Sequence, residues 1–187
     1  MAERHVLILG GARSGKTAYG ERLAMRAGVK PAYLATAEAL DGEMAERVAL
    51  HQRERHGRFA TIEEPVELAA AILRAARDHD VILVDCLTLW ISNLLGAGVD
   101  VAAAVEDLAA TLVQVKTARV ILVSNEVGLG IVPDNALARS FRDLAGAAHQ
   151  RLAQICADVY FVVAGLPMVL KGAPPAAQNE GTGVHEA

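Results

Sequence analysis

The stretch that decides the fold is Gly10-Gly11-Ala12-Arg13-Ser14-Gly15-Lys16-Thr17, which has the form G-x-x-x-x-G-K-[ST]. An apolar run, residues 6–9, precedes it, and a helix-forming stretch, residues 18–26, follows it. Glycines let the backbone wrap closely around a polyphosphate, and the N–H groups at a helix start face the anion. Lys16 supplies a positive charge for the β- and γ-phosphates, and Thr17 supplies a hydroxyl for a magnesium ion. In this context the motif predicts a phosphate-binding loop (P-loop) rather than a chance glycine turn.

Length and composition favour one α/β domain. A chain of 187 residues is long enough for one domain with its own core. It is 53% hydrophobic but only 4% aromatic, which suits buried parallel strands and alanine-rich helices. The net charge of −4 and the pI of about 5.9 argue against a nucleic-acid partner. Apolar runs fall short of the roughly 20 residues that a membrane span needs.

Cysteine usage and the two ends of the chain suggest where the protein works. Cys86 and Cys156 have neither metal-ligand spacing nor a disulfide framework, which fits a reducing cytoplasm. The N-terminus leads into a short strand without the pattern of a signal peptide. Residues 173–187 contain proline and glycine without an apolar pattern, which predicts a disordered tail. We therefore expect a cytoplasmic protein with a single domain over residues 1–172.

Strand and helix patterns alternate along the chain. The expected strands are residues 5–10, 31–36, 59–62, 81–84, 120–123, 159–163 and a further one at 168–171. The expected helices are residues 14–28, 41–56, 66–77, 87–95, 101–115 and 135–156. Uninterrupted apolar strands joined by helices predict a mostly parallel sheet with helices on both faces. Ligands of such sheets bind beyond the carboxyl ends of the strands.

Polar residues stand at several of these strand ends. Asp85 follows the apolar run 81–84, where a P-loop protein places the carboxylate that holds magnesium. The same residue would also fit as a cap for the next helix, although the P-loop upstream favours the metal role. Thr36 ends another strand. Ser124-Asn125-Glu126-Val127-Gly128 follows a third, either as part of the site or as a connecting loop.

Two helical patterns are ambiguous from spacing alone. His51 shares a helical face with Met44 and Val48, a position that usually indicates packing or surface. A neutral imidazole can nevertheless attack phosphorus and form a phosphoramidate, so both interpretations stay open. On the last helix an apolar line runs through Leu137, Phe141, Leu144, Ala148, Leu152 and Ile155. Its other side carries an i,i+4 pair, Arg139 and Asp143, with His149 and Gln150 beyond, which predicts a solvated, salt-bridged face.

Seven motifs together indicate a family. They are the P-loop, Tyr33-Leu34-Ala35-Thr36, Glu43-Met44-Ala45-Glu46-Arg47-Val48 with His51, Asp85-Cys86-Leu87-Thr88-Leu89-Trp90 with Ser92-Asn93-Leu94-Leu95, Ser124-Asn125-Glu126-Val127-Gly128, Gly130-Ile131-Val132-Pro133, and Leu137-Ala138-Arg139 with Phe141-Arg142-Asp143, Gly146 and Gln150. Over residues 6–171 they resemble the bifunctional adenosylcobinamide kinase / adenosylcobinamide-phosphate guanylyltransferases of cobalamin synthesis. The P-loop is generic, whereas the block from Asn125 to Asp143 is far more specific.

The resemblance implies two reactions. Such an enzyme phosphorylates a hydroxyl on the aminopropanol arm of adenosylcobinamide with ATP or GTP. It then moves GMP from GTP onto the new phosphate through a covalent guanylyl-histidine, which releases pyrophosphate and yields adenosyl-GDP-cobinamide. The resemblance also implies Mg²⁺, a RecA-like P-loop fold, and a homotrimer with sites near the subunit contacts.

Site residues follow by position. The histidine nucleophile maps onto His51, and Lys16 is the second catalytic residue. Besides the P-loop, the nucleotide-binding positions are Ala35, Thr36, Gln52, Arg53, Glu54, Arg55, Glu63 and Asp85, with Thr17 and Asp85 on the metal. Two positions depart from the family pattern: Phe59 stands where tryptophan is frequent, and His149 stands where asparagine is common. They leave open how the corrinoid is held.

Three other functions remain as alternatives. A small-molecule kinase would use the same loop but leave His51 structural. A nucleotide-binding regulatory module or ATPase would also need the loop, but the sequence offers no obvious arginine finger or basic groove for it. A corrinoid-binding protein without catalysis would not need Lys16, Thr17 and Asp85.

Overall fold

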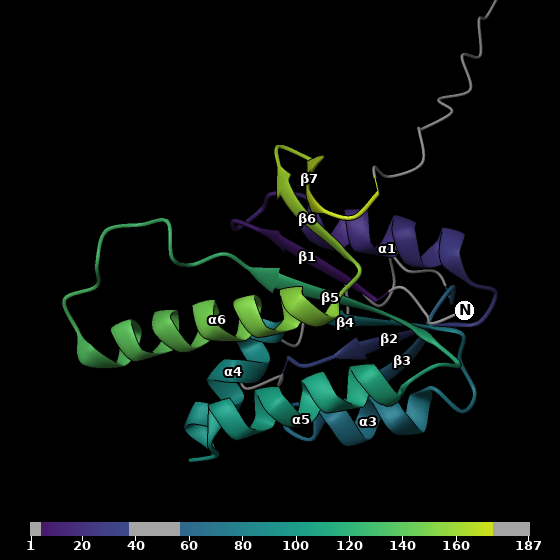
Figure 1. Ribbon diagram of the computed structural model, residues 1–187, viewed down its shortest axis with the longest axis horizontal. Helices are drawn as coiled ribbons and strands as arrows, with labels where there is room; N and C mark the ends of the chain where they lie inside the picture. The colour runs from purple at the N-terminus through teal and green to yellow at the C-terminus, as the bar shows by residue number, and fades with distance from the viewer. Residues whose placement is uncertain (1–4, 38–56, 174–187) are drawn as a thin grey trace, which may run out of the picture.

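The computed structural model describes residues 5–37 and 57–173. Within these residues the chain forms a seven-stranded sheet in the order β3-β2-β4-β5-β1-β6-β7 (Figure 1). The strands are β1 (Val6–Gly10), β2 (Pro31–Ala35), β3 (Ala60–Glu63), β4 (Val81–Asp85), β5 (Arg119–Asn125), β6 (Asp158–Val163) and β7 (Leu166–Lys171). The described helices are α1 (Lys16–Ala27), α3 (Leu68–Ala75), α4 (Leu87–Gly96), α5 (Val101–Gln114) and α6 (Ala136–Ile155).

The predicted sheet is confirmed. Strands β1 to β6 pair in parallel, and only β7 runs antiparallel, beside β6. The expected helix 66–77 begins only at Leu68, because the Glu64 carboxylate accepts hydrogen bonds from the backbone N–H groups of Val66 and Glu67 just before it. The expected helix 41–56 lies outside the described residues, as does the expected tail except for Ala173.

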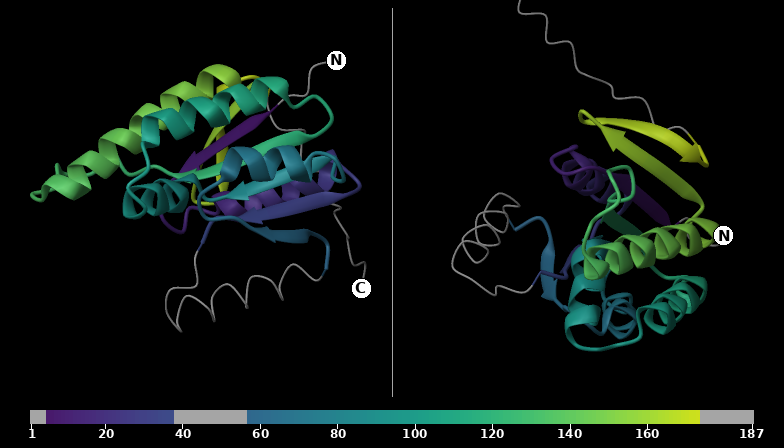
Figure 2. Two further views of the ribbon diagram at one scale, coloured as in Figure 1. Left: turned by 90° about the horizontal axis from the view of Figure 1, so that it is seen from below. Right: turned by 90° about the vertical axis from the view of Figure 1, so that its left-hand side faces the viewer.

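Helices cover both faces of the sheet, as predicted. Helix α1 packs on one face, whereas α3, α4, α5 and α6 lie on the other (Figures 1 and 2). Along each inner strand, side chains point alternately to the two faces of the sheet. Ile8 packs with Tyr19 of α1 on one face, and Leu7 belongs to the larger core on the opposite face. Burial on both faces explains why these strands read as continuous apolar runs.

Helix α6 extends beyond the sheet. Its later turns bury Ala145, Ala148 and Leu152, but Leu137 in the first turn is 69% exposed. The chain from β5 runs away from the sheet before it returns as α6, so the first turns project past the strand ends (Figure 1). Leu137 therefore lies on the apolar line without being buried, because helical periodicity does not reveal where the covering sheet stops.

The described helices are all too short or too polar to cross a membrane.

Candidate active site

The carboxyl edge of the sheet gathers predicted site residues from four strands. Register places Gly10 beside Asn125, and Asp85 two positions earlier along β5, beside Val123. On the other side of β4, Asp85 pairs with Ala35, which in turn pairs with Glu63. Because parallel strands end at one edge, residues far apart in sequence form one row there, where ligands of such sheets bind.

The P-loop is shaped by its glycines. A Cβ at Gly10 would lie 2.6 Å from both Ser14 Oγ and the Val162 carbonyl oxygen, so a side chain does not fit. Gly15 has φ of +90°, and its Cβ would lie 3.0 Å from Gly165 Cα in the β6–β7 turn. The Gly165 N–H donates to the Ser14 carbonyl at 2.8 Å, which ties the loop to that turn. The predicted loop thus has the close-packed backbone that a phosphate cradle requires.

Polar groups of the loop suit a phosphate. Lys16 is 8% exposed, and its Nζ donates to the Gly11 carbonyl at 3.1 Å, across the loop. Thr17 follows in the first turn of α1, which starts directly at the loop. The Ser14 hydroxyl is buried and, within the described part of the chain, has no hydrogen-bond partner. A bound anion would satisfy donors of this kind at a helix start.

Asp85 is oriented by a group that sequence reasoning missed. The Tyr33 hydroxyl donates a 2.8 Å hydrogen bond to Asp85 Oδ2, from the neighbouring strand β2. The aromatic ring of Tyr33 is itself fixed by an edge-on contact with Phe59. Side chains alternate along a strand, so Tyr33 lies on the same face of β2 as Ala35, which pairs with Asp85. This spacing is the sequence signal that could have placed Tyr33 near Asp85.

A polar network holds the turn that follows Asp85. Thr36 Oγ1 donates to the Cys86 carbonyl at 2.8 Å and accepts from the Cys86 N–H at 2.9 Å. Thr88 Oγ1 accepts from Asn125 Nδ2 at 3.0 Å, and Cys86 Sγ lies 3.1 Å from the same hydroxyl. Asn93 of α4 binds the Thr36 carbonyl at 2.8 Å. Thr36 therefore fixes the backbone beside Asp85, and burial raises the pKa of the Cys86 thiol, which leaves it protonated.

A second buried cluster lies between β5 and α6. The Ser124 hydroxyl is 2.7 Å from His149 Nε2, and His149 Nδ1 is 3.7 Å from Glu126 Oε2. His149 is 6% exposed, so the solvated helix face predicted for it is wrong. Burial lowers the pKa of the imidazole, against the opposing influence of Glu126. Glu126 in turn donates its backbone N–H to the Gly10 carbonyl at 3.0 Å, so the cluster adjoins the P-loop.

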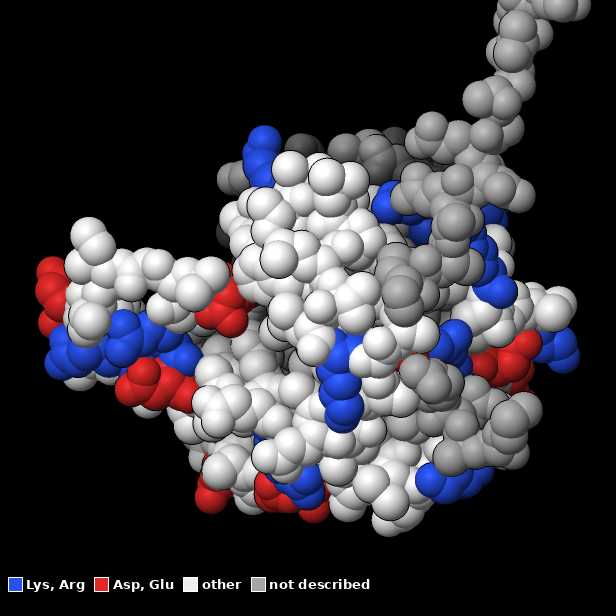
Figure 3. Space-filling model, turned by 45° about the horizontal axis from the view of Figure 1, so that its top comes forward, with Lys and Arg blue, Asp and Glu red and all other residues white. Residues whose placement is uncertain are grey.

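The expected Arg139–Asp143 pair is also replaced. Arg139 Nη1 donates to the carbonyls of Pro133 and Asp134, and holds the segment that leads into α6. Asp143 instead pairs with Arg142 at 3.2 Å. Charges of both signs gather on the projecting end of the molecule (Figure 3).

Several predicted site residues are outside the described part of the chain. These are His51, Gln52, Arg53, Glu54 and Arg55. Glu63 is described, at the exposed end of β3. Among residues 5–37 and 57–173, no group of three or more His, Cys, Asp or Glu side chains could hold a metal ion by itself.

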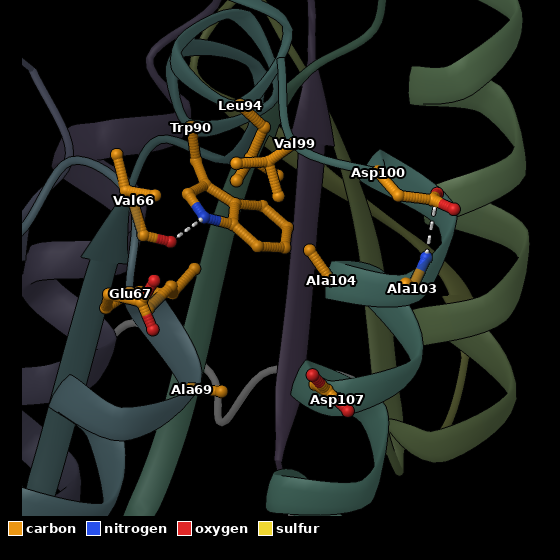
Figure 4. A pocket seen from close by; sticks show the side chains of 11 residues that line it. Val66, Glu67, Ala69, Trp90, Leu94, Val99, Asp100, Ala103, Ala104 and Asp107 are labelled. Carbon is orange, nitrogen blue, oxygen red and sulfur yellow. Dashed lines mark hydrogen bonds between the residues drawn. The ribbon is translucent and has the colours of Figure 1, made fainter. Parts of the chain in front are cut away.

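Two pockets lie away from the P-loop. One, of about 190 Å³, opens between α3, α4 and α5 over Trp90, whose indole N–H donates to the Val66 carbonyl at 2.8 Å (Figure 4). Another, of about 530 Å³, lies between the end of α4 and the start of α6, and Leu95, Leu137 and Phe141 are among its lining residues. Neither is lined by a predicted site residue.

Comparison with solved structures supports the fold. A KaiC-like protein from the archaeon Pyrococcus horikoshii matches with a TM-score of 0.52 at 14% identity, covering 86% of this chain and 71% of that one. The RadB recombinase matches with a TM-score of 0.50 at 16% identity, covering 86% and 74%. The chain therefore has the RecA-like P-loop fold that was expected.

Comparison with known sequences shows the family. Residues 6–170 match the family model described as cobinamide kinase / cobinamide phosphate guanyltransferase. The bifunctional adenosylcobalamin biosynthesis protein CobP of Pseudomonas aeruginosa is 48% identical over 171 residues, which cover 90% of this chain and 98% of that protein. CobU of Salmonella typhimurium is 40% identical over 180 residues, covering 89% and 99%. By these matches and by its P-loop site, this chain belongs to the cobinamide kinase / cobinamide phosphate guanyltransferase family.

Proposed function

We propose that this protein carries out both reactions named by its family. In the first, the aminopropanol hydroxyl of adenosylcobinamide attacks the γ-phosphorus of ATP or GTP. In the second, GMP is transferred from GTP to the new phosphate, pyrophosphate is released, and adenosyl-GDP-cobinamide is formed. The observation that carries this proposal is the P-loop, closed around Lys16 at the same sheet edge as Asp85.

One nucleotide site can serve both steps. Each reaction is an attack at phosphorus that depends on positioning and on neutralising the charge of the phosphates. The P-loop N–H groups and Lys16 would hold the triphosphate in both cases. Attack at the γ-phosphorus gives the kinase, and attack at the α-phosphorus gives the guanylylated enzyme.

The residues present fit a magnesium ion. Thr17 offers a hydroxyl and Asp85 a carboxylate, and oxygen donors of this kind are those that Mg²⁺ prefers. The Tyr33 hydroxyl donates to Oδ2 of Asp85 and so helps to hold this carboxylate in place. When bound, the ion would neutralise charge on the phosphates.

His51 is the proposed nucleophile of the second step. A neutral imidazole attacks the α-phosphorus, a phosphorus–nitrogen bond forms, and the bond to the pyrophosphate oxygen breaks. The cobinamide phosphate oxygen then attacks the same phosphorus and releases His51. Support for this assignment is the position of His51 within the family motif.

The proposal also covers the oligomeric state and the cellular compartment of the protein. Exposed apolar side chains on the β5–α6 segment, Leu129, Ile131, Val132 and Leu137, are of a kind that subunit contacts bury, which supports an oligomer. We propose the homotrimer that the family resemblance implies. Light scattering on the purified chain, at 19.7 kDa per subunit, would distinguish a trimer from a monomer. Two buried, reduced cysteines fit the cytoplasm.

The test of function is direct. Purified protein is incubated with adenosylcobinamide, Mg²⁺ and ATP, then with GTP, and products are identified by mass. We expect adenosylcobinamide phosphate after the first addition and adenosyl-GDP-cobinamide after the second. The His51→Ala variant should form the first product and not the second. Failure of the wild-type protein to phosphorylate cobinamide would contradict the proposal.

A further inference from the structure

Ser124, His149 and Glu126 form a line of three side chains that reaches the P-loop. Ser124 stands near the end of β5, Glu126 stands just beyond it, and His149 comes from the late part of α6, which lies along the sheet (Figure 1). The Ser124 Oγ–His149 Nε2 distance is 2.7 Å, and the His149 Nδ1–Glu126 Oε2 distance is 3.7 Å. The second distance is longer than a hydrogen bond and marks a close contact between the imidazole and the carboxylate.

The order of donors in this line follows from chemistry. Carboxylate oxygens accept hydrogen bonds, so we assign the proton to the His149 nitrogen that faces Glu126. His149 Nε2 then accepts, and the Ser124 hydroxyl donates to it. A neutral imidazole has one proton to give, and this tautomer turns it toward Glu126 while Nε2 binds Ser124.

The burial of the three side chains shows which of them a substrate can reach. The same three residue types form the nucleophilic site of serine hydrolases, but Ser124 is fully buried, so a substrate does not reach its hydroxyl. Glu126 is the most exposed of the three, at 21% of its side chain, whereas the side chain of His149 is 7% exposed. Its backbone N–H binds the Gly10 carbonyl, and its carboxylate accepts the Gly128 N–H. The backbone of Glu126 is thus bonded to the P-loop, and its carboxylate contacts His149 and the Gly128 N–H.

We propose that Ser124 and His149 position the Glu126 carboxylate beside the P-loop, where it accepts the proton of the cobinamide hydroxyl during the kinase step. This rests on the proposed function. The hydroxyl oxygen bonds to the γ-phosphorus, the bond from that phosphorus to the β-bridging oxygen breaks, and the nucleoside diphosphate leaves. The hydroxyl proton moves to Glu126. His149 is a positioning residue, because it acts through Glu126.

Two amides at position 149 separate positioning from packing. In His149→Asn the side-chain amide can occupy the place of Nδ1 and still donate to Glu126. In His149→Gln the amide reaches the place of Nε2, so it keeps the Ser124 contact and loses Glu126. We expect His149→Asn to keep the kinase kcat within about threefold, and His149→Gln to lower it by tenfold or more, with KM for ATP unchanged. Equal losses in both variants would overturn the proposal.

A double variant tests whether His149 acts through Glu126. Glu126→Gln should lower kcat by about 10²–10⁴-fold, as removal of a general base does. Adding His149→Gln should then cost no more than about twofold, because the residue it positions is already lost. If the double variant instead lost kcat by the product of the two single losses, the positioning role of His149 would be overturned. Melting temperatures of all variants show whether each one is folded.

A spectroscopic readout separates this inference from the proposed function. If the wild-type protein phosphorylates no cobinamide, the proposed function fails, and the role of Glu126 as proton acceptor fails with it. The positioning contact is then judged from ¹⁵N spectra of the imidazoles. An Nδ1-protonated His149 that shifts in Glu126→Gln supports the contact, and an Nε2-protonated ring would overturn it.

Discussion

At the residue scale, the two adjacent glycines at the start of the P-loop have different surroundings. A Cβ at Gly10 would meet the Val162 carbonyl and Ser14 Oγ, both at 2.6 Å, whereas a Cβ at Gly11 would have nothing within 4 Å. Part of that contact is backbone, which does not move aside as a flexible side chain would. Gly10 is therefore required by packing against β6, and Gly11 is not.

The glycine pair gives a matched prediction. Gly10→Ala should lower the free energy of unfolding by about 1–3 kcal/mol, the usual cost of forcing extra atoms into a packed site. Gly11→Ala, the control, should change it by less than about 0.5 kcal/mol. Urea denaturation followed by circular dichroism measures both. Equal effects in the two variants would contradict the packing argument.

Site residues near the P-loop could be predicted where a short sequence motif identifies them. The P-loop and Asp85 could be placed from sequence because each is a short motif at the end of an apolar run. The Tyr33–Asp85 and Ser124–His149 contacts join residues 52 and 25 positions apart, and they exist only once the elements have packed. The spacing of residues along α6 predicted a solvated face for His149, because this spacing carries no information about the packing of β5 against that face.

At the element scale, α6 contacts β5 through a buried histidine, His149, which lies 2.7 Å from Ser124 Oγ. Burial lowers the pKa of His149 below its ordinary value near 6.5. In the unfolded chain the same imidazole takes up a proton at a higher pH than in the folded protein. The stabilisation is therefore present above about pH 6.5 and is lost as the pH falls below that value.

The pH prediction uses a variant as its reference. Between pH 7 and pH 5, the free energy of unfolding of the wild-type protein should fall more than that of His149→Asn, which cannot take up a proton there. Denaturant titrations at several pH values measure the difference, which isolates His149 from other titrating groups. Parallel pH curves for the two proteins would show that this imidazole is not held neutral.

Element boundaries could be predicted more easily than element surroundings. The apolar runs of β4 and β5 identified buried strands, because parallel strands covered on both faces have little room for polar residues. Helix α6 was predicted with its length nearly right, yet its first turns pass beyond the sheet and leave Leu137 exposed. The reach of the sheet is a property of the assembled layers, so periodicity could not supply it.

At the scale of the whole molecule, the site belongs to the sheet rather than to one loop. The carboxyl ends of β1, β2, β3, β4 and β5 all contribute to it, and the β6–β7 turn supports the P-loop through Gly165. A ligand bound there contacts a structure that exists only in the folded chain. Binding should therefore stabilise the entire molecule by mass action.

Thermal unfolding tests this coupling. At about 100 times its dissociation constant, Mg²⁺-GTP should add about 2.7 kcal/mol, or roughly 5–10 °C in melting temperature for a chain of this size. Lys16→Ala should remove most of the shift, because it deletes the cation that faces the phosphates. A full shift in Lys16→Ala would mean that the nucleotide binds elsewhere.

The covalent intermediate is the most direct test of the central claim that this chain transfers GMP as well as phosphate. The protein is incubated with Mg²⁺ and GTP labelled in the α-phosphate, denatured, and examined for label that acid removes and alkali spares, beside His51→Ala. We predict label on the wild-type protein and none on the variant, as a guanylyl-histidine requires. Wild-type protein without label, or a His51→Ala variant labelled equally, would contradict the claim.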